Sequence, residues 1–230
     1  MDQIRNALAA ALAQLGGQAL NLYKTVTGEE IQPKLSGLVE EVQKNKNIHV
    51  HLDTSLAKVE GFVGNFEATL SNNGSKEKLD FGVAVMATGA APLKPDEYHY
   101  GDDPRILSSL ELDKKFIDQD PDLKKLKTAV FIQCVGSREP HRPYCSRVCC
   151  THSIDNALQL KKLNPDMNII ILYRDIRTYG EREYLYKEAR AAGVIFMGFS
   201  PDNKQKVVME DGKVLVNTHD PMLVLDVQIE

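Results

Sequence analysis

Four clustered cysteines constrain this sequence more than any other feature. The chain has 230 residues and only four cysteines, with the spacing Cys134-x10-Cys145-x3-Cys149-Cys150. Disulfide-stapled secreted domains carry far more cysteines for their length, and two disulfides here would have to include or straddle the adjacent pair. We therefore interpret this segment as a shared metal centre.

Alternating strands and helices are expected around the cysteines. The apolar patterns predict a strand at 129–134, a helix at 145–163, a strand at 169–173, a helix at 181–192 and a strand at 194–197. Right-handed crossovers would place the three strands side by side in a parallel sheet. This βαβαβ order is typical of one half of a nucleotide-binding domain.

The rest of the chain predicts a second, smaller α/β unit and a C-terminal hairpin. We expect helices at 7–13, 35–42 and 108–117, an antiparallel meander of strands at 48–52, 56–62, 66–70 and 79–86, and a hairpin or meander at 206–229. Ser108 and Glu111 form a capping box. A boundary at 121–125 divides the chain into domains at 1–122 and 123–230.

Charge and hydropathy exclude several classes of protein. The chain has 28 Lys and Arg against 32 Asp and Glu, a net charge of −4. This balance predicts no nucleic-acid surface and no anionic-membrane surface. No apolar run approaches the roughly 20 residues of a membrane helix, and no positive cluster precedes the apolar stretch 7–13. We expect a cytoplasmic protein that does not insert into a membrane.

The cysteines replace the glycine-rich loop that dinucleotide-binding units carry after their first strand. In a helix that begins at Cys145, this residue and Cys149 share a face, Cys150 lies on the adjoining face, and Cys134 reaches in from the strand end. Four such thiolates can hold one 4Fe-4S cluster. The helix N-terminus and basic side chains would stabilise its negative charge; these side chains are Arg138, Arg142 and Arg147.

Other interpretations of the cysteines stay open at this point. A four-cysteine zinc site is the main rival, although adjacent cysteines fit tetrahedral zinc knuckles poorly. Buried structural cysteines would be scattered over core faces, and a redox dithiol would need a Cys-x-x-Cys motif. Asp175 stands where an acid binds a ribose in NAD sites, but the glycine loop that it would work with is missing. Arg174 and Arg177 are interpreted either as solvent-exposed side chains of the loop or as side chains that surround the cluster.

Several motifs accompany the cysteine spacing. They are Cys134-Val-Gly-Ser-Arg138, Tyr144-Cys-Ser-Arg-Val-Cys-Cys150, Tyr173-Arg-Asp-Ile-Arg-Thr-Tyr-Gly180, Gly16-Gly17-Gln18, Asn21-Leu-Tyr-Lys24, Val59-Glu-Gly-Phe-Val-Gly-Asn-Phe66, Ala87-Thr-Gly-Ala90 and Pro95-Asp-Glu-Tyr98. Together they resemble the A-subunit family of heterodisulfide reductase, which includes flavin subunits of quinone-interacting sulfate-reduction complexes. The resemblance covers Gly16 to Glu230. It implies an FAD flavoprotein of thioredoxin-reductase-like architecture, with a 4Fe-4S cluster on the four cysteines in the NAD-type domain.

The resemblance also implies which residues face the flavin. They are Gly16, Gly17 and Gln18 in one segment and Thr88, Gly89 and Ala90 in another. The family begins with an N-terminal strand and a Gly-rich FAD fingerprint; we expect neither before Gly16, and we expect no closing FAD segment after Glu230. We therefore expect an internal piece of the flavoprotein, with part of an FAD-type domain at 1–122, which folds without bound FAD.

The expected function is that of an electron-transfer module in a flavin and iron-sulfur oxidoreductase. The resemblance implies that electrons pass between FAD, the cluster and partner subunits, and it leaves room for a homodimer. The alternative is a non-catalytic scaffold domain whose four cysteines hold a structural zinc ion.

Overall fold

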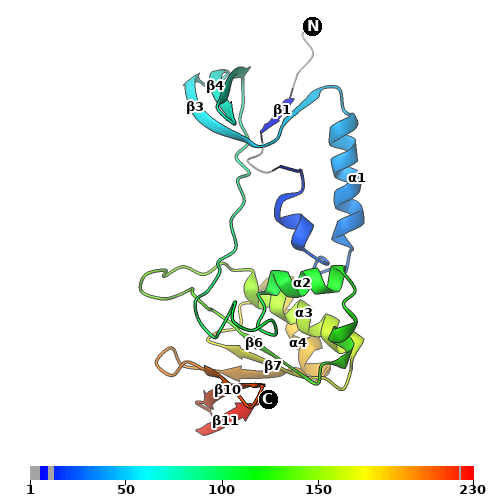
Figure 1. Ribbon diagram of the computed structural model, residues 1–230, viewed down its shortest axis with the longest axis vertical. Helices are drawn as coiled ribbons and strands as arrows, with labels where there is room; N and C mark the ends of the chain where they lie inside the picture. Colours follow the sequence, from blue (N-terminus) through cyan, green and yellow to red (C-terminus); the bar gives the residue numbers. More distant parts are fainter. Residues whose placement is uncertain (1–5, 10–12, 223) are drawn as a thin grey trace. The chain divides into compact units, whose positions relative to one another are not determined.

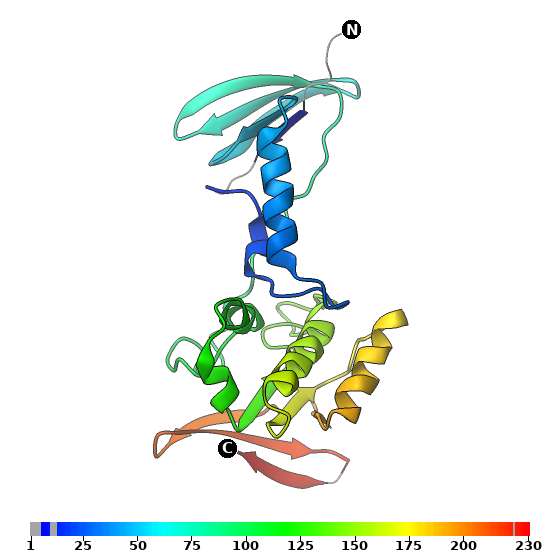
Figure 2. The same ribbon diagram turned by 90° about the vertical axis from the view of Figure 1, so that its right-hand side faces the viewer.

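The computed structural model describes residues 6–9, 13–222 and 224–230, which form two compact units. The first unit contains Met1–Thr25 and Glu30–Ala91, and the second contains Val26–Glu29 and Pro92–Glu230 (Figures 1 and 2). The predicted division of the chain into domains at 1–122 and 123–230 stays a prediction.

The first unit begins with a βαβ arrangement. Strand β1 (Asn6–Ala9) pairs in parallel with β2 (Ile48–His51), and the connection contains the 3-10 helix η1 (Gly17–Asn21) and the helix α1 (Ile31–Lys44). The helix predicted at 7–13 is wrong at 7–9, and the expectation that no strand precedes Gly16 is wrong as well, because pairing with β2 overrides the helix propensity of alanine. Residues 10–12 lie outside the described part of the chain.

An antiparallel meander of three strands completes the first unit, as predicted. The fourth strand predicted for it, at 48–52, is wrong in its pairing, because β2 pairs in parallel with β1 in a separate sheet. Strands β3 (Thr54–Phe62), β4 (Asn65–Asn72) and β5 (Ser75–Phe81) lie in the order β3-β4-β5. The β4–β5 turn has positive φ at Asn73 (44°) and Gly74 (89°), the combination typical of tight hairpins. The last predicted strand, at 79–86, is wrong at its end. Residues 82–86 follow β5 without forming a strand in the structure.

The second unit contains the predicted βαβαβ fold. Strands β6 (Thr128–Ile132), β7 (Asn168–Tyr173) and β8 (Ile195–Gly198) form a parallel sheet in the order β6-β7-β8. The crossovers contain α3 (Cys149–Leu163), then η3 (Gly180–Arg182) and α4 (Glu183–Ala191). Before the sheet come α2 (Ser109–Ile117), which has the predicted Ser108–Glu111 capping box, and η2 (Pro121–Lys125).

Strand β7 is buried on both faces, which places the core of the second unit at the centre of the sheet. Ile170 and Leu172 pack with Phe199 and Val216 of the C-terminal part. That part is a meander of β9 (Lys206–Glu210), β10 (Lys213–Asp220) and β11 (Leu225–Ile229), in the order β11-β10-β9. Side chains alternate along a strand, so the fully buried Ile169 and Ile171 belong to the opposite face. Strand β7 is therefore the centre of this core, and the chain just after its end reaches Cys150 through the Asp175 carbonyl oxygen.

Candidate metal centre

The four cysteines gather at the junction of β6 and α3. Cys134 lies two residues after the end of β6, and Cys149 and Cys150 are the first two residues of α3. The predicted helix start at Cys145 is wrong, so Cys145 and Cys149 do not share a helix face, and Cys145 belongs to the connecting loop. All four are free cysteines; Cys150 is buried and the other three are half-buried.

The loop between β6 and α3 has an unusual backbone. Its φ angles are positive at Cys134 (63°), Gly136 (62°), Arg138 (59°) and Arg147 (64°). Three of these four are not glycine, and an L-residue in this region costs about 1–2 kcal/mol. Sparsely populated backbone conformations of this kind persist only where the surrounding structure enforces them, and they concentrate at functional sites.

A salt-bridged anchor holds this loop against the rest of the unit. Arg174, whose side chain is 7% exposed, donates from Nη1 to the Arg138 carbonyl oxygen at 2.9 Å and forms an ion pair with Glu139. Lys204 Nζ lies 2.9 Å from Glu139 Oε1. Phe199 lies beneath the Arg174 guanidinium, with 5.8 Å between Cζ and the ring centroid. The loop that carries the first cysteine is thus tied to the end of β7.

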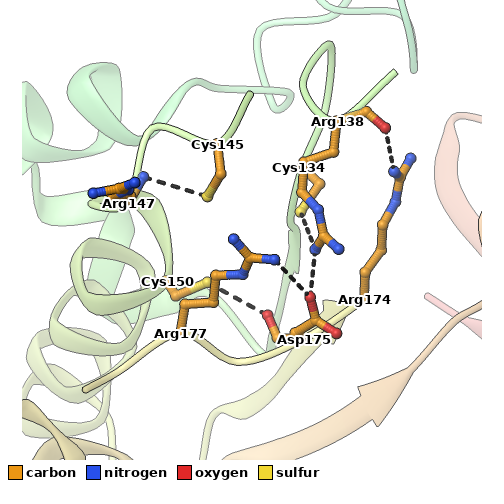
Figure 3. Close-up of polar contacts among 8 residues, drawn as sticks. All are labelled: Cys134, Arg138, Cys145, Arg147, Cys150, Arg174, Asp175 and Arg177. Atoms are coloured by element: carbon orange, nitrogen blue, oxygen red, sulfur yellow. Dashed lines mark hydrogen bonds and ion pairs between the residues drawn. The ribbon is translucent and has the colours of Figure 1, made fainter. Parts of the chain in front are cut away.

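Two arginines interact with cysteines and meet at one carboxylate. Arg138 Nη1 lies 3.9 Å from Cys134 Sγ and 2.7 Å from Asp175 Oδ2. Arg177 has its Nη2 atom 3.2 Å from Asp175 Oδ2, and this hydrogen bond together with the charge of Cys145 raises the pKa of Arg177. Figure 3 shows both guanidinium groups reaching the Asp175 side chain. The backbone N–H of Arg147 also donates to Cys145 Sγ, at 3.4 Å.

The start of α3 favours one thiolate over its neighbour. The Cys150 thiol donates to Cys149, and together with Ser146 and the N–H groups of the helix N-terminus it lowers the pKa of Cys149 to about 6. The same hydrogen bond, with burial, raises the pKa of Cys150. Cys150 Sγ also lies 3.7 Å from the carbonyl oxygen of Asp175. Burial raises the pKa of Cys134 against the opposing effect of Arg138.

The donor set fits an iron-sulfur cluster in its chemistry. Within the described residues, no group of three or more His, Cys, Asp or Glu side chains meets at one point as ligands of a single ion would. A 4Fe-4S cluster binds each cysteine at a different iron, so its four sulfurs surround a volume instead of a point. Four free thiols, two neighbouring guanidinium groups and a helix N-terminus provide soft ligands and positive charge for an anionic cluster.

The arginines were only partly predictable. Arg138 contacts a cysteine as expected, whereas Arg147 contributes its backbone N–H. Arg177 interacts electrostatically with Cys145, which is compatible with a place beside the cluster; this role stays a prediction. The role of Asp175 as their common partner was missed. The available signal was its position two residues after a buried strand, at the same edge of the sheet as Cys134.

The predicted flavin segments meet within the first unit. Gln18 Nε2 donates to the carbonyl oxygen of Ala90 at 3.3 Å, which brings 16–18 next to the end of 88–90. Gly16 (φ 116°), Gly17 (φ 52°) and Gly89 (φ 63°) have conformations that favour glycine. Contact between these six residues and FAD stays a prediction.

One further property concerns membranes. Among the helices in the described ranges, none is both long enough and apolar enough to cross a lipid bilayer.

Comparisons with known proteins support the resemblance. A scan against protein families gives no match. The chain is 34% identical over 138 residues to the second iron-sulfur A subunit of CoB--CoM heterodisulfide reductase in Methanopyrus kandleri, covering 53% of this chain and 21% of that protein. It is 34% identical over 173 residues to the iron-sulfur A subunit of CoB--CoM heterodisulfide reductase in Methanocaldococcus jannaschii, covering 66% of this chain and 26% of that protein.

A solved structure supports the fold. The thioredoxin reductase of T. acidophilum matches with a TM-score of 0.54 and 12% identity, covering 98% of this chain and 66% of that one. The predicted thioredoxin-reductase-like α/β architecture is therefore confirmed. The predicted resemblance to heterodisulfide reductase A subunits is confirmed as well, although the chain spans only about a fifth to a quarter of the two relatives above.

Proposed function

We propose, from its similarity to heterodisulfide reductase A subunits, that this chain is the cluster-bearing electron-transfer part of a flavin and iron-sulfur oxidoreductase. One observation carries the proposal. At the strand–helix junction where a nucleotide-binding unit would carry its glycine-rich loop, four free cysteines gather beside two arginines. The names of the relatives, which call them iron-sulfur subunits, support the same assignment.

Cys134, Cys145, Cys149 and Cys150 would each bind one iron of a 4Fe-4S cluster. When bound, the cluster supplies a site that accepts and releases single electrons. The low pKa of Cys149 prepares one ligand as a thiolate. Arg138 and Arg177 place positive charge beside Cys134 and Cys145, which stabilises the negative charge of thiolate ligands. The anchor of Arg174 and Glu139 keeps the loop in place.

We extend the proposal to the complete protein. FAD would contact Gly16, Gly17 and Gln18 together with Thr88, Gly89 and Ala90, and the meeting of Gln18 with Ala90 supports a common site. Electrons would pass between FAD, the cluster and partner subunits, because the relatives are named as subunits of larger enzymes. A cytoplasmic location and a homodimer belong to the same proposal.

The test is anaerobic purification of the chain followed by iron, zinc and acid-labile sulfide analysis. We expect about four irons and about four sulfides per chain, with a broad visible absorbance that dithionite bleaches. Stoichiometric zinc without sulfide would contradict the proposal and would favour the structural zinc scaffold. Reconstitution with iron and sulfide is included, because oxidation of the thiols during handling empties such sites.

A further inference from the structure

We propose that Asp175 is a positioning residue, which holds Arg138 and Arg177 against two different cysteines of the candidate cluster site. This inference rests on the proposed function, because it assigns a role at the same site. In a dinucleotide-binding unit, an acid at this place recognises a ribose. Here its carboxylate faces two guanidinium groups of its own chain (Figure 3).

A single carboxylate oxygen links the two sides of the site. Asp175 Oδ2 lies 2.7 Å from Arg138 Nη1, and this same nitrogen lies 3.9 Å from Cys134 Sγ. Asp175 Oδ2 also lies 3.2 Å from Arg177 Nη2, and Arg177 interacts electrostatically with Cys145. Each arginine is therefore held between the carboxylate and one cysteine.

The backbone of the same residue reaches a third cysteine. The Asp175 carbonyl oxygen lies 3.7 Å from Cys150 Sγ. The position of Asp175 is well defined, because it follows the buried strand β7 and the buried Arg174. Arg174 donates to the Arg138 carbonyl oxygen, so Arg138 is held to the end of β7 by its backbone as well as by its side chain.

The arrangement resolves an apparent conflict of charge. A carboxylate alone would disfavour an anionic cluster nearby, but Asp175 is paired with two cations, which leaves a positive group of three side chains. Without a partner, long arginine side chains sample many rotamers and spread their charge through solvent. Pairing with Asp175 keeps both charges beside sulfur atoms, where they favour the more negative, reduced state of a cluster.

The test is a double-mutant cycle on the midpoint potential of the cluster, measured in the full chain with Arg138→Gln, Asp175→Asn and both together. Arg138→Gln should lower the potential, because it removes a cation beside Cys134. In the Asp175→Asn background the same substitution should shift the potential by less than half as much, since Arg138 is no longer held there. Equal shifts in the two backgrounds would overturn the proposal, because they would mean that Asp175 acts only through its own charge.

Asp226→Asn is the matched control. Its carboxylate is exposed and pairs with His219 in the C-terminal meander, with Oδ1 2.8 Å from Nδ1. In this background the shift caused by Arg138→Gln should equal that in the unsubstituted chain.

A second measurement does not need the cluster. Hydrogen–deuterium exchange of the metal-free chain should become several-fold faster between residues 135 and 148 in Asp175→Asn and should stay unchanged in Asp226→Asn. Unchanged exchange in Asp175→Asn would overturn the positioning role. A chain that binds no iron and sulfide would refute the proposed function, and the exchange experiment would still decide the role of Asp175.

Discussion

Gly136→Ala should destabilise the protein for two separable reasons. The substitution therefore tests the conformation of the loop between β6 and α3, which carries Cys134 and Cys145. Gly136 has a φ of 62°, in the left-handed region that disfavours a side chain. In addition, a Cβ built at this position would overlap Cδ2 of Leu93. The substitution therefore introduces backbone strain and a steric clash at the same residue.

The two contributions can be estimated from the structure. An alanine at this φ costs about 1–2 kcal/mol, and the loss of conformational freedom in the unfolded chain offsets roughly 0.4–1 kcal/mol of that. Overpacking costs about 1–3 kcal/mol, and the lower half applies because Leu93 is 39% exposed and can move. We expect Gly136→Ala to lower the free energy of unfolding by about 2–3 kcal/mol in urea denaturation.

Gly180→Ala is the matched control, because Gly180 has a φ of 63° and no atom within 4 Å of the added Cβ. It should cost only the strain, about 1 kcal/mol. Leu93→Ala should reduce the cost of Gly136→Ala to the same value. If Gly136→Ala and Gly180→Ala are equally costly, or if Leu93→Ala relieves nothing, the described packing of Leu93 on the loop is wrong.

Three other predictions test the site, the core and the flavin. In the metal-free chain, the rate at which iodoacetamide alkylates Cys149 should rise with pH as the thiolate forms and should be half-maximal near pH 6. Alkylation of Cys134 and Cys150 should need more alkaline conditions. Equal pH profiles of the three cysteines, followed by mass spectrometry, would contradict this. Ile171→Ala, at a fully buried position of β7, should lower the free energy of unfolding by about 2–5 kcal/mol, and Ile195→Ala, at a half-exposed position, by much less; similar urea midpoints would argue against this core. The 230-residue chain should purify without FAD, because it has no Gly-rich loop to hold the pyrophosphate; one oxidised flavin per chain in the visible spectrum would show that the flavin site is misplaced.

The sequence predicted the second unit well because its signals are strong and local. The buried run at β7 and the flanking helix patterns predicted βαβαβ, and the position of the cysteines at a strand–helix junction followed from that order. The start of α3 was missed because Arg147 has a φ of 64°, which interrupts the helix between Cys145 and Cys149. No local pattern shows such a break.

Long-range pairing explains the remaining differences. Asn6–Ala9 is rich in alanine, which favours a helix, but it forms β1 because β2 lies beside it. The partnership of Asp175 with Arg138 spans the crossover from β6 to β7, so the local sequence shows only that Asp175 follows a buried strand and not which residue it contacts. Gln18 and Ala90 are 72 residues apart, a longer separation, and only the resemblance linked their segments beforehand.

The most direct test of the central claim is the acid-labile sulfide and iron content of four single variants, Cys134→Ser, Cys145→Ser, Cys149→Ser and Cys150→Ser. If the four cysteines together hold one 4Fe-4S cluster, each variant should lose most of its iron and sulfide after anaerobic reconstitution, while urea denaturation shows that it still folds. A folded variant that keeps the iron and sulfide content of the unsubstituted chain would show that this cysteine is not a ligand, and would contradict the four-cysteine site.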